Sequence, residues 1–261
     1  MNREIVLSQQ SSLKKRTNIS FISTVIVLTF VYLQVNPLTI LTAFPDFLLF
    51  FIQNFFPADF SNLASYLPLI LETILFAIVG TYFSAFLAFF FGLLMSEKTN
   101  PIAWLRIISR FMMSFLRNIP VLVWASLLVY VFGIGNMVGL IALIIATLGF
   151  LARSYAETMN EIAGSKLEAL QASGASYLQV LFHGLIPEFI PAWLNWTLFS
   201  FEINIRASAI LGMVGAGGIG IMIQTNIRLF NYHQALALII VLVALVLLTE
   251  FGVNKLRRWL V

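Results

Sequence analysis

The sequence predicts an all-α, polytopic membrane protein with about six transmembrane helices. Hydrophobic residues make up 60% of the 261 residues, and charged residues only 10%. The mean hydropathy of +0.96 lies far above that of soluble globular proteins. Apolar runs long enough to cross roughly 30 Å of hydrocarbon recur along the chain. Lys and Arg cluster between these runs, as they do in cytoplasmic loops.

Composition also limits the chemistry. The chain has no Cys and only two His, His183 and His233, which lack the spacing of metal ligands. Disulfides, thiolate metal sites and cysteine nucleophiles are therefore excluded, and no metal site is expected. No Ser/His/Asp set falls within a predicted span, so we predict no catalytic and no cofactor-binding residue. The pI near 9.5 reflects basic loops and does not predict nucleic-acid binding.

The first part of the chain begins with a polar segment, residues 1–18, which we predict to be a cytoplasmic tail. The apolar run 19–35 follows three basic residues. No small-residue cleavage site follows this run, so we interpret it as a retained first span and not as a signal peptide. In residues 43–56 the polar side chains share one helical face, which predicts an amphipathic helix at the outer membrane interface.

Five further spans are expected, at about residues 65–95, 112–133, 137–154, 188–211 and 236–251. This arrangement places every Lys/Arg cluster and both termini on the cytoplasmic side. Residues 255–261 are then a cytoplasmic C-terminal tail. No linker interrupts residues 19–254, which are expected to form a single transmembrane domain.

The third span contains Arg117 and Pro120. Residues 120–133 are too few to cross the membrane, so the span must begin near Met112 and hold Arg117 inside the hydrocarbon slab. Pro120 removes a helix hydrogen bond and predicts a kink. Two interpretations stay open for Arg117: a side chain that snorkels to the interface, or a residue that lines a pathway at the kinked helix.

The fifth span contains Glu202, Asn204 and Arg206, which are candidates for a pathway or gate. Glu202 and Arg206 are four residues apart, so they share a helical face and can pair. Ionisable groups inside a membrane cost roughly 2.5–3.5 kcal/mol each, and they usually face a bundle interior or a water-filled path. The pair either fixes helix packing or leaves Arg206 to handle an anion, because its planar donor fork suits phosphate and phosphonate oxygens. Glu72, near the outer end of the second span, is interpreted as a helix-packing or interfacial group.

A glycine-rich run follows, with Gly215, Gly217, Gly218 and Gly220. Its spacing formally matches a dinucleotide-binding fingerprint, but it does not follow a strand of a βαβ unit. The run instead predicts a break between membrane helices that permits close helix approach or a non-helical turn.

The long polar stretch at residues 164–187 predicts two short capped helices. Ser165-x-x-Glu168 and Ser176-x-x-Gln179 both have the spacing of a capping box. Gly174 suits the left-handed residue that follows the end of the first helix.

The same stretch resembles the coupling loop of permease subunits of ATP-binding-cassette importers. The residues that carry the resemblance are Glu168, Ala169, Leu170, Gly174, Ile186 and Pro187. Two departures are visible: Leu170 replaces the usual second Ala, and Gly184 stands where an Ile is common. The resemblance implies that residues 164–187, the coupling segment, dock onto an ATP-hydrolysing subunit.

Further motifs narrow the resemblance to the phosphonate/phosphite-type, binding-protein-dependent type I permeases. From about residue 65 onward, the similar stretches are residues 71–73, 117–125, 201–207 and 214–220. The resemblance implies the type I importer permease fold and a homodimer with its pathway at the two-fold axis. It also implies two partner ATPase subunits that hold ATP and Mg, an external binding protein that delivers phosphonate, phosphite or a related oxyanion, and a multi-pass location in the cell inner membrane. This chain lacks a Gly-x-x-x-x-Gly-Lys-[Ser/Thr] motif, so it is expected to be a transport subunit and not an enzyme.

Other classes stay open, among them a purely structural membrane protein, which would not need the buried Glu202–Arg206 pair. A permease for another small solute such as methionine shares the coupling loop and the Arg-x-Ile-Pro pattern, although the Glu-x-Asn-x-Arg run is not expected there. An ion-coupled secondary transporter would use Glu72, Glu202 and Arg206, but it would have no need for the coupling segment.

Overall fold

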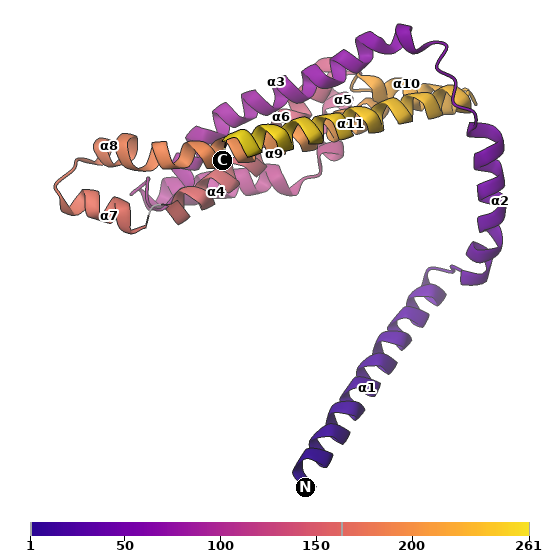
Figure 1. The fold of residues 1–261 in the computed structure, drawn as a ribbon, viewed down its shortest axis with the longest axis horizontal. Helices are drawn as coiled ribbons and strands as arrows, with labels where there is room; N and C mark the ends of the chain where they lie inside the picture. The colour runs from indigo at the N-terminus through magenta and orange to yellow at the C-terminus, as the bar shows by residue number, and fades with distance from the viewer. Residues whose placement is uncertain (1, 163, 261) are drawn as a thin grey trace. The chain divides into compact units, whose positions relative to one another are not determined.

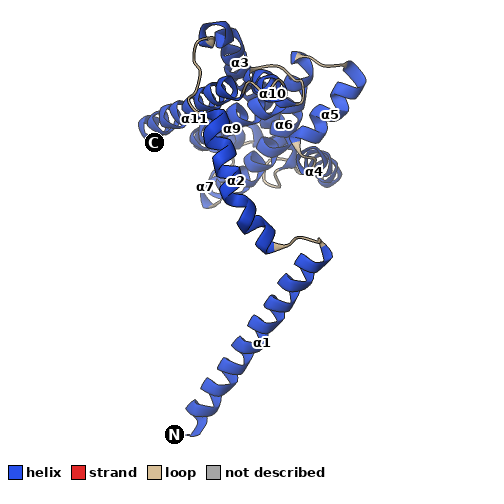
Figure 2. Cartoon of the chain, turned by 90° about the vertical axis from the view of Figure 1, so that its right-hand side faces the viewer, coloured by secondary structure: helices blue, strands red, loops and turns tan. Residues whose placement is uncertain are grey.

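The computed structural model describes residues 2–162 and 164–260, with side-chain surroundings described from Lys14 onward except at positions 16, 165, 166 and 260. Within these residues the elements are helices and no strand occurs (Figures 1 and 2), which confirms the all-α prediction. Internal contacts divide the chain into two units, one ending at Phe56 and the other beginning at Pro57.

The first unit consists of α1 (Asn2–Tyr32) and α2 (Pro37–Phe55). The backbone of α1 is already helical within the segment predicted as a polar tail. Asn36 caps α2 by accepting a hydrogen bond from the Leu38 N–H at 2.9 Å, and Pro37 occupies the first turn, where its missing N–H has no cost. Because the helix extends back to this cap, α2 is longer than the predicted interfacial helix. Its length and composition are those of a candidate membrane span.

The second unit contains the remaining helices. They are α3 (Leu63–Met95), α4 (Ala103–Asn118), α5 (Val121–Phe132), α6 (Asn136–Ile162), α7 (Ser165–Ala172), α8 (Tyr177–Gln179), the π-helix η1 (Val180–Leu185), α9 (Ile186–Met213), α10 (Ile219–Arg228) and α11 (Tyr232–Leu260). Helix α6 lies centrally and contacts α3, α4, α5 and α9. Figure 1 shows α7 and α8 at one end of this unit and α10 at the other.

Small residues allow α3 and α6 to pack closely. The face of α3 that turns inward includes Ala77, Gly80, Ser84, Ala88 and Gly92, and all are buried. A Cβ atom added to Gly80 would lie 2.8 Å from the Leu143 Cδ2 of α6. Membrane helices associate through such van der Waals contact, because lipid tails are as apolar as the side chains themselves.

Length and composition identify four candidate spans among the described helices: α2, α3, α6 and most of α11. Helices α4 and α5 together make a fifth, bent by 87° at a short break. Helix α9 is long enough to cross a membrane but carries Glu188, Glu202 and Arg206. The apolar part of α1, Thr17–Tyr32, is shorter than the other candidates.

Candidate functional site

The first helix of the coupling segment ends where its sequence predicts. Gly174 has a φ of +85°, the left-handed conformation expected after a helix end. The Ala175 N–H donates to Leu170 O at 3.1 Å, and the Gly174 N–H donates to Gln171 O at 3.0 Å. These two bonds form a Schellman motif, which pairs the last carbonyls of α7 and turns the chain toward α8.

The start of α7 differs from the prediction. The carbonyl of Gly164 already accepts from the N–H groups of Leu167 and Glu168, at 3.2 and 3.4 Å. Gly164 is therefore the N-cap, and Ser165 is the first helical residue. The predicted Ser165-x-x-Glu168 capping box was wrong by this one-residue shift. The Glu168 carboxylate instead lies 3.6 Å from the Lys98 ammonium group.

The second capping box is confirmed. The backbone N–H of Ser176 donates to Gln179 Oε1 at 2.8 Å, as the box requires. The helix then continues through η1, where the Ile186 N–H bonds to Leu181 O five residues earlier. Pro187 lies in the first turn of α9, a position that tolerates its missing N–H.

The two departures from the coupling-loop pattern lie against each other. A Cβ atom on Gly184 would lie 2.5 Å from Leu167 Cδ2 and 2.8 Å from Leu170 Cδ1. Leu170 thus fills the space that a larger residue at position 184 would need. The leucine and the glycine compensate one another, and α7 packs directly on η1.

The six residues that carry the coupling-loop resemblance differ in their exposure to solvent. Glu168, Ala169, Gly174 and Pro187 are exposed, whereas Leu170 and Ile186 are half-buried. Glu168 and Ala169 belong to α7, which Figure 1 shows beyond the ends of the long helices, whereas Pro187 lies in the first turn of α9.

Arg117 lies at a sharp bend. It occupies the last turn of α4, and Pro120 is the N-cap of α5. The Trp124 Nε1–H donates to Leu116 O at 3.1 Å across the break. Gly149 of α6 permits close approach here, because an added Cβ atom would lie 2.8 Å from the Arg117 backbone nitrogen. The kink predicted at Pro120 is present as an 87° bend, so the span predicted from about Met112 consists of two helices, and the first of them begins earlier, at Ala103.

Glu202 and Arg206 form the predicted ion pair on α9, with a Glu202 Oε1 to Arg206 Nη2 distance of 2.5 Å. The Glu202 side chain is 12% exposed and the Arg206 side chain 50% exposed. Arg206 shares its open face with the exposed side chains of Ile203 and Ile210. A half-open guanidinium among apolar side chains would be costly against lipid. This face therefore suits a water-filled path or a second protein surface.

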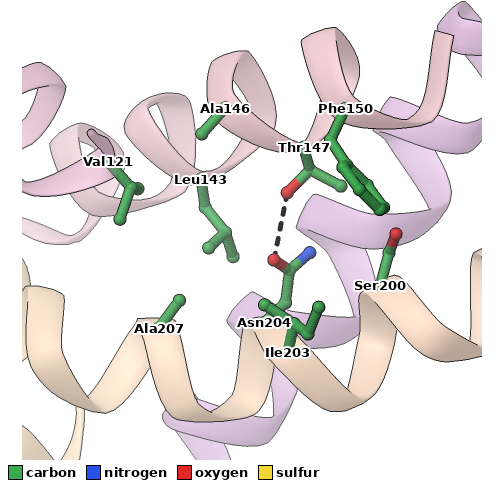
Figure 3. Close-up of a pocket in the computed structure, with 9 residues that line it drawn as sticks. All are labelled: Val121, Leu143, Ala146, Thr147, Phe150, Ser200, Ile203, Asn204 and Ala207. Carbon is green, nitrogen blue, oxygen red and sulfur yellow. Dashed lines mark hydrogen bonds between the residues drawn. The ribbon is translucent and has the colours of Figure 1, made fainter. Parts of the chain in front are cut away.

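Asn204 points the other way, into the helix core. Its Nδ2–H donates to Thr81 Oγ1 at 2.8 Å, and its Oδ1 accepts from the Thr147 hydroxyl at 3.0 Å (Figure 3). The amide thus ties α9 to both α3 and α6, and the residue is only 4% exposed. Asn204 and Arg206 do not share a surface.

Asn204 also lines a cavity of about 180 Å³ between α5, α6 and α9. Figure 3 shows that its walls are mainly apolar, with Thr147, Ser200 and Asn204 as the polar lining residues. The Ser200 hydroxyl is buried and has no hydrogen-bond partner among the described residues.

The glycine-rich run forms a turn between α9 and α10. Gly215, Gly217 and Gly218 all have positive φ values, of 94°, 88° and 72°. Gly220, within α10, lies so close to Ala209 O that no side chain would fit. Both predicted uses of the run, a non-helical turn and close helix approach, are present.

Glu72 and Thr73 of α3 hold this turn. The Glu72 carboxylate accepts from the Gly218 N–H at 2.9 Å and also from the Asn136 side-chain amide. The Thr73 hydroxyl accepts from the Ile219 N–H at 2.8 Å. The first N–H groups of α10, which have no partner within that helix, are therefore paired by α3. Glu72 is a packing group, as its sequence position predicted.

Comparison with known proteins identifies the family. The sequence pattern of the family described as "Binding-protein-dependent transport system inner membrane component" matches residues 88–261. The chain belongs to this family. The predicted resemblance to importer permeases is thereby confirmed, and the match covers the coupling segment, Arg117, the Glu202–Arg206 pair and the glycine turn.

Individual relatives agree with the family assignment. The phosphite transport system permease protein PtxC of Stutzerimonas stutzeri is 29% identical over 77% of this chain and 74% of that protein. The phosphate-import permease protein PhnE of Mycolicibacterium smegmatis is 30% identical over 79% of this chain, but the chain spans only 39% of that protein. The solved structure of the MetNI methionine ABC transporter has a TM-score of 0.66 at 23% identity, and covers 75% of this chain and 96% of that chain. This likeness confirms the fold.

The sequence did not predict several polar residues that complete these contacts. Thr73 and Asn136 complete the Glu72 contacts, and Thr81 and Thr147 complete those of Asn204. Asn136, Thr81 and Thr147 lie far away in the sequence from the residues they contact and in other helices, whereas Thr73 is next to Glu72 in α3. The only available signal was that Thr73 follows Glu72 within a stretch similar to related permeases.

Proposed function

We propose that this chain is the permease subunit of an ATP-binding-cassette importer that moves phosphonate, phosphite or a related phosphorus oxyanion inward. The observation that carries the proposal is that helical structure runs unbroken from the coupling segment into α9. From the Ser176 cap, α8, η1 and α9 follow one another without a break as far as Met213. One helical rod therefore joins the exposed coupling segment to the Glu202–Arg206 pair.

The phosphorus oxyanion is supported by Arg206 and by the names of relatives. The guanidinium presents a planar fork of donors, and Glu202 occupies one of its nitrogens in this structure. A phosphonate or phosphite carries oxygens that match the same fork. In the proposed cycle Arg206 exchanges Glu202 for the passing oxyanion. The relatives named for phosphite and phosphate transport support this substrate class.

The open face of α9 supports a homodimer with its pathway between the two copies. Two ATPase subunits would bind the two coupling segments and hold ATP and Mg, and an external binding protein would deliver the substrate. ATP binding would draw the coupling segments together and shift the permease between two states through differential contacts. The chain itself is a transport subunit of the cell inner membrane with both termini cytoplasmic, and hydrolysis belongs to the partner.

The test is the ATPase activity of the purified complex with its binding protein, titrated separately with phosphite, phosphate, methylphosphonate and methionine. Stimulation by phosphorus oxyanions and not by methionine is expected. Stimulation by methionine alone would contradict the substrate class, and the absence of any co-purified ATPase would contradict the importer class.

Arg206 supplies the matched mutational test. Arg206→Ala should raise the half-stimulating oxyanion concentration roughly tenfold to hundredfold, because a hydrogen bond to a charged group contributes about 1.5–3 kcal/mol. Arg206→Lys keeps the charge but not the fork, so it should fall between Arg206→Ala and wild type. Arg228→Ala, which removes an exposed arginine from the end of α10, is the control. Equal effects at both positions would contradict the role of Arg206.

A further inference from the structure

The loop after α3, residues 96–100, is fixed to the end of that helix. Each of the last four carbonyls of α3 accepts a hydrogen bond, whereas helix ends normally leave such groups without an intrahelical partner. The four bonds are Ser96 N–H to Gly92 O at 3.0 Å, Thr99 Oγ1 to Leu93 O at 2.6 Å, Asn100 Nδ2 to Leu94 O at 2.8 Å and Arg110 Nε to Met95 O at 2.9 Å. Ser96, Thr99 and Asn100 are buried. We name residues 96–100 the junction loop.

The junction loop also joins α4 and α6. Arg106 of α4 donates from Nη1 to Asn100 O at 2.8 Å. Asn160 of α6 accepts through Oδ1 from both the Ser96 hydroxyl, at 2.8 Å, and the Glu97 N–H, at 2.9 Å. Three helices thus meet at one short turn, whose residues Ser96, Thr99 and Asn100 are buried and hydrogen-bonded to the helices around them. A displacement of this turn would move all three helix ends together.

The coupling segment touches the junction loop at two points, one from each of its helices. From α7, Glu168 lies 3.6 Å from the Lys98 ammonium group. From α8, the Tyr177 hydroxyl donates to the carbonyl of Thr99. Two separated contacts fix the orientation of one body against another, which a single contact does not.

We propose that the junction loop transmits movement of the coupling segment to α3, α4 and α6, and that Tyr177 and Lys98 are the positioning residues that make this connection. The inference rests on the proposed coupling to an ATPase. It extends that function, because the chain itself connects the coupling segment only to α6 before it and to α9 after it, and not to α3 or α4. The junction loop provides a second path, and α4 carries it on to the 87° bend beside Arg117.

The two contacts should contribute unequally to the transmission of movement. Lys98 and Glu168 are both well exposed, with side-chain exposures of 48% and 69%, and exposed ion pairs are weak. The bond from Tyr177 reaches a backbone carbonyl of a buried residue and is partly shielded from solvent. Tyr177 should therefore carry more of the transmission than Lys98 does.

The first experiment compares Tyr177→Phe with wild type in the reconstituted complex. The ATPase subunits should co-purify in the wild-type ratio. Stimulation of ATP hydrolysis by substrate-loaded binding protein should fall on the order of fivefold or more, the lower end of typical coupling between sites. Tyr82→Phe is the matched control, because Tyr82 is an exposed tyrosine of α3 itself. Equal stimulation in Tyr177→Phe and wild type would overturn the proposal. Loss of the ATPase subunits from Tyr177→Phe would also overturn it, because it would place Tyr177 in the docking surface.

A second measurement follows movement directly and needs no substrate. The chain has no cysteine, so Trp104→Cys introduces a single spin-label site at an exposed position in the first turn of α4. The distance between labels on the two copies should change when ATP is trapped with vanadate. This change should be largely lost when Lys98→Ala and Tyr177→Phe are combined.

The outcomes separate the two hypotheses. An unchanged label movement in the combined variant would overturn the role of the junction loop while leaving the importer function standing. A wild-type complex without any bound ATPase would contradict the importer function itself, and the junction-loop proposal with it.

Discussion

The two ends of α3 use polar groups in opposite ways. Near its N-terminal end, Glu72 and Thr73 offer side-chain acceptors to the backbone donors of the glycine turn. At its C-terminal end, the helix's own carbonyls are the acceptors, and the junction loop supplies the donors. The first arrangement depends on a few residues that hold a constrained turn. The second is spread over many bonds, so a single change there should alter coupling more than folding.

The largest effect is expected from Gly217→Ala. This glycine has a φ of +88°, and an added Cβ atom would meet the Asn136 side chain. The strained backbone should reduce the free energy of unfolding by about 3 kcal/mol, measured by thermal unfolding in detergent. Gly135→Ala is the control, because nothing lies near its added Cβ atom. Equal stability of the two variants would show that the glycine turn is not constrained as described.

The next largest effect is expected from Glu72→Gln. The amide keeps one acceptor oxygen, so either the Gly218 N–H or the Asn136 amide loses its partner. An unpaired donor of this kind should cost about 2 kcal/mol in the same unfolding assay, while the ATPase subunits stay bound. Glu250→Gln, at an exposed glutamate of α11, should have no such effect. If Glu72→Gln also lost the bound ATPase subunits, the proposed difference between the two ends of α3 would be contradicted.

A smaller and local effect is expected from Gly184→Ile in the coupling segment. The new side chain would crowd Leu167 and Leu170, and overpacking of this kind typically costs about 1–3 kcal/mol. Hydrogen exchange of the α7 amides should accelerate about tenfold, which corresponds to about 1.4 kcal/mol. Combining Gly184→Ile with Leu170→Ala should restore part of the protection. If the combined variant exchanged faster than Gly184→Ile alone, the compensation between these two positions would be contradicted.

The smallest effect concerns Asp59, in the corner before α3. Ser61 lowers the pKa of Asp59 below its usual value of 3.8 by hydrogen bonding to the carboxylate through its side chain and its backbone N–H. The ionised form is favoured in the folded state, so this contribution is present above pH 3.8 and is lost as the pH falls below it. The carboxylate is fully exposed, so the effect is small. Wild type should be more stable than Asp59→Asn at about pH 6, and the difference should shrink as the pH falls below 3.8. A difference that did not depend on pH would contradict the assignment.

Local signals explain what could be predicted from the sequence. Gly174 and the Ser176/Gln179 box act within one turn of helix, and Glu202 and Arg206 are one turn apart. Their spacing in the sequence was therefore enough to predict the helix end, the capping box and the ion pair. The error at Ser165 was also local, because the helix begins one residue earlier than predicted, with Gly164 as its N-cap.

The contacts that could not be predicted join distant segments. Glu72 meets Gly218, and Asn160 meets Ser96, only because α3, α6 and α9 pack side by side. The bend at Pro120 could be predicted as a kink. Its angle depends on the close approach permitted by Gly149 and on the bond from Trp124, which no local pattern encodes.

The central claim, ATP-driven import of a phosphorus oxyanion, is tested most directly by uptake into proteoliposomes. The vesicles would contain the permease and its ATPase, with the binding protein and isotopically labelled phosphite or phosphonate on the opposite side from the ATP. We predict accumulation that requires both ATP and the binding protein and that is strongly reduced by Arg206→Ala. Uptake of labelled methionine in place of the oxyanion, or oxyanion uptake driven by an ion gradient without ATP, would contradict the claim.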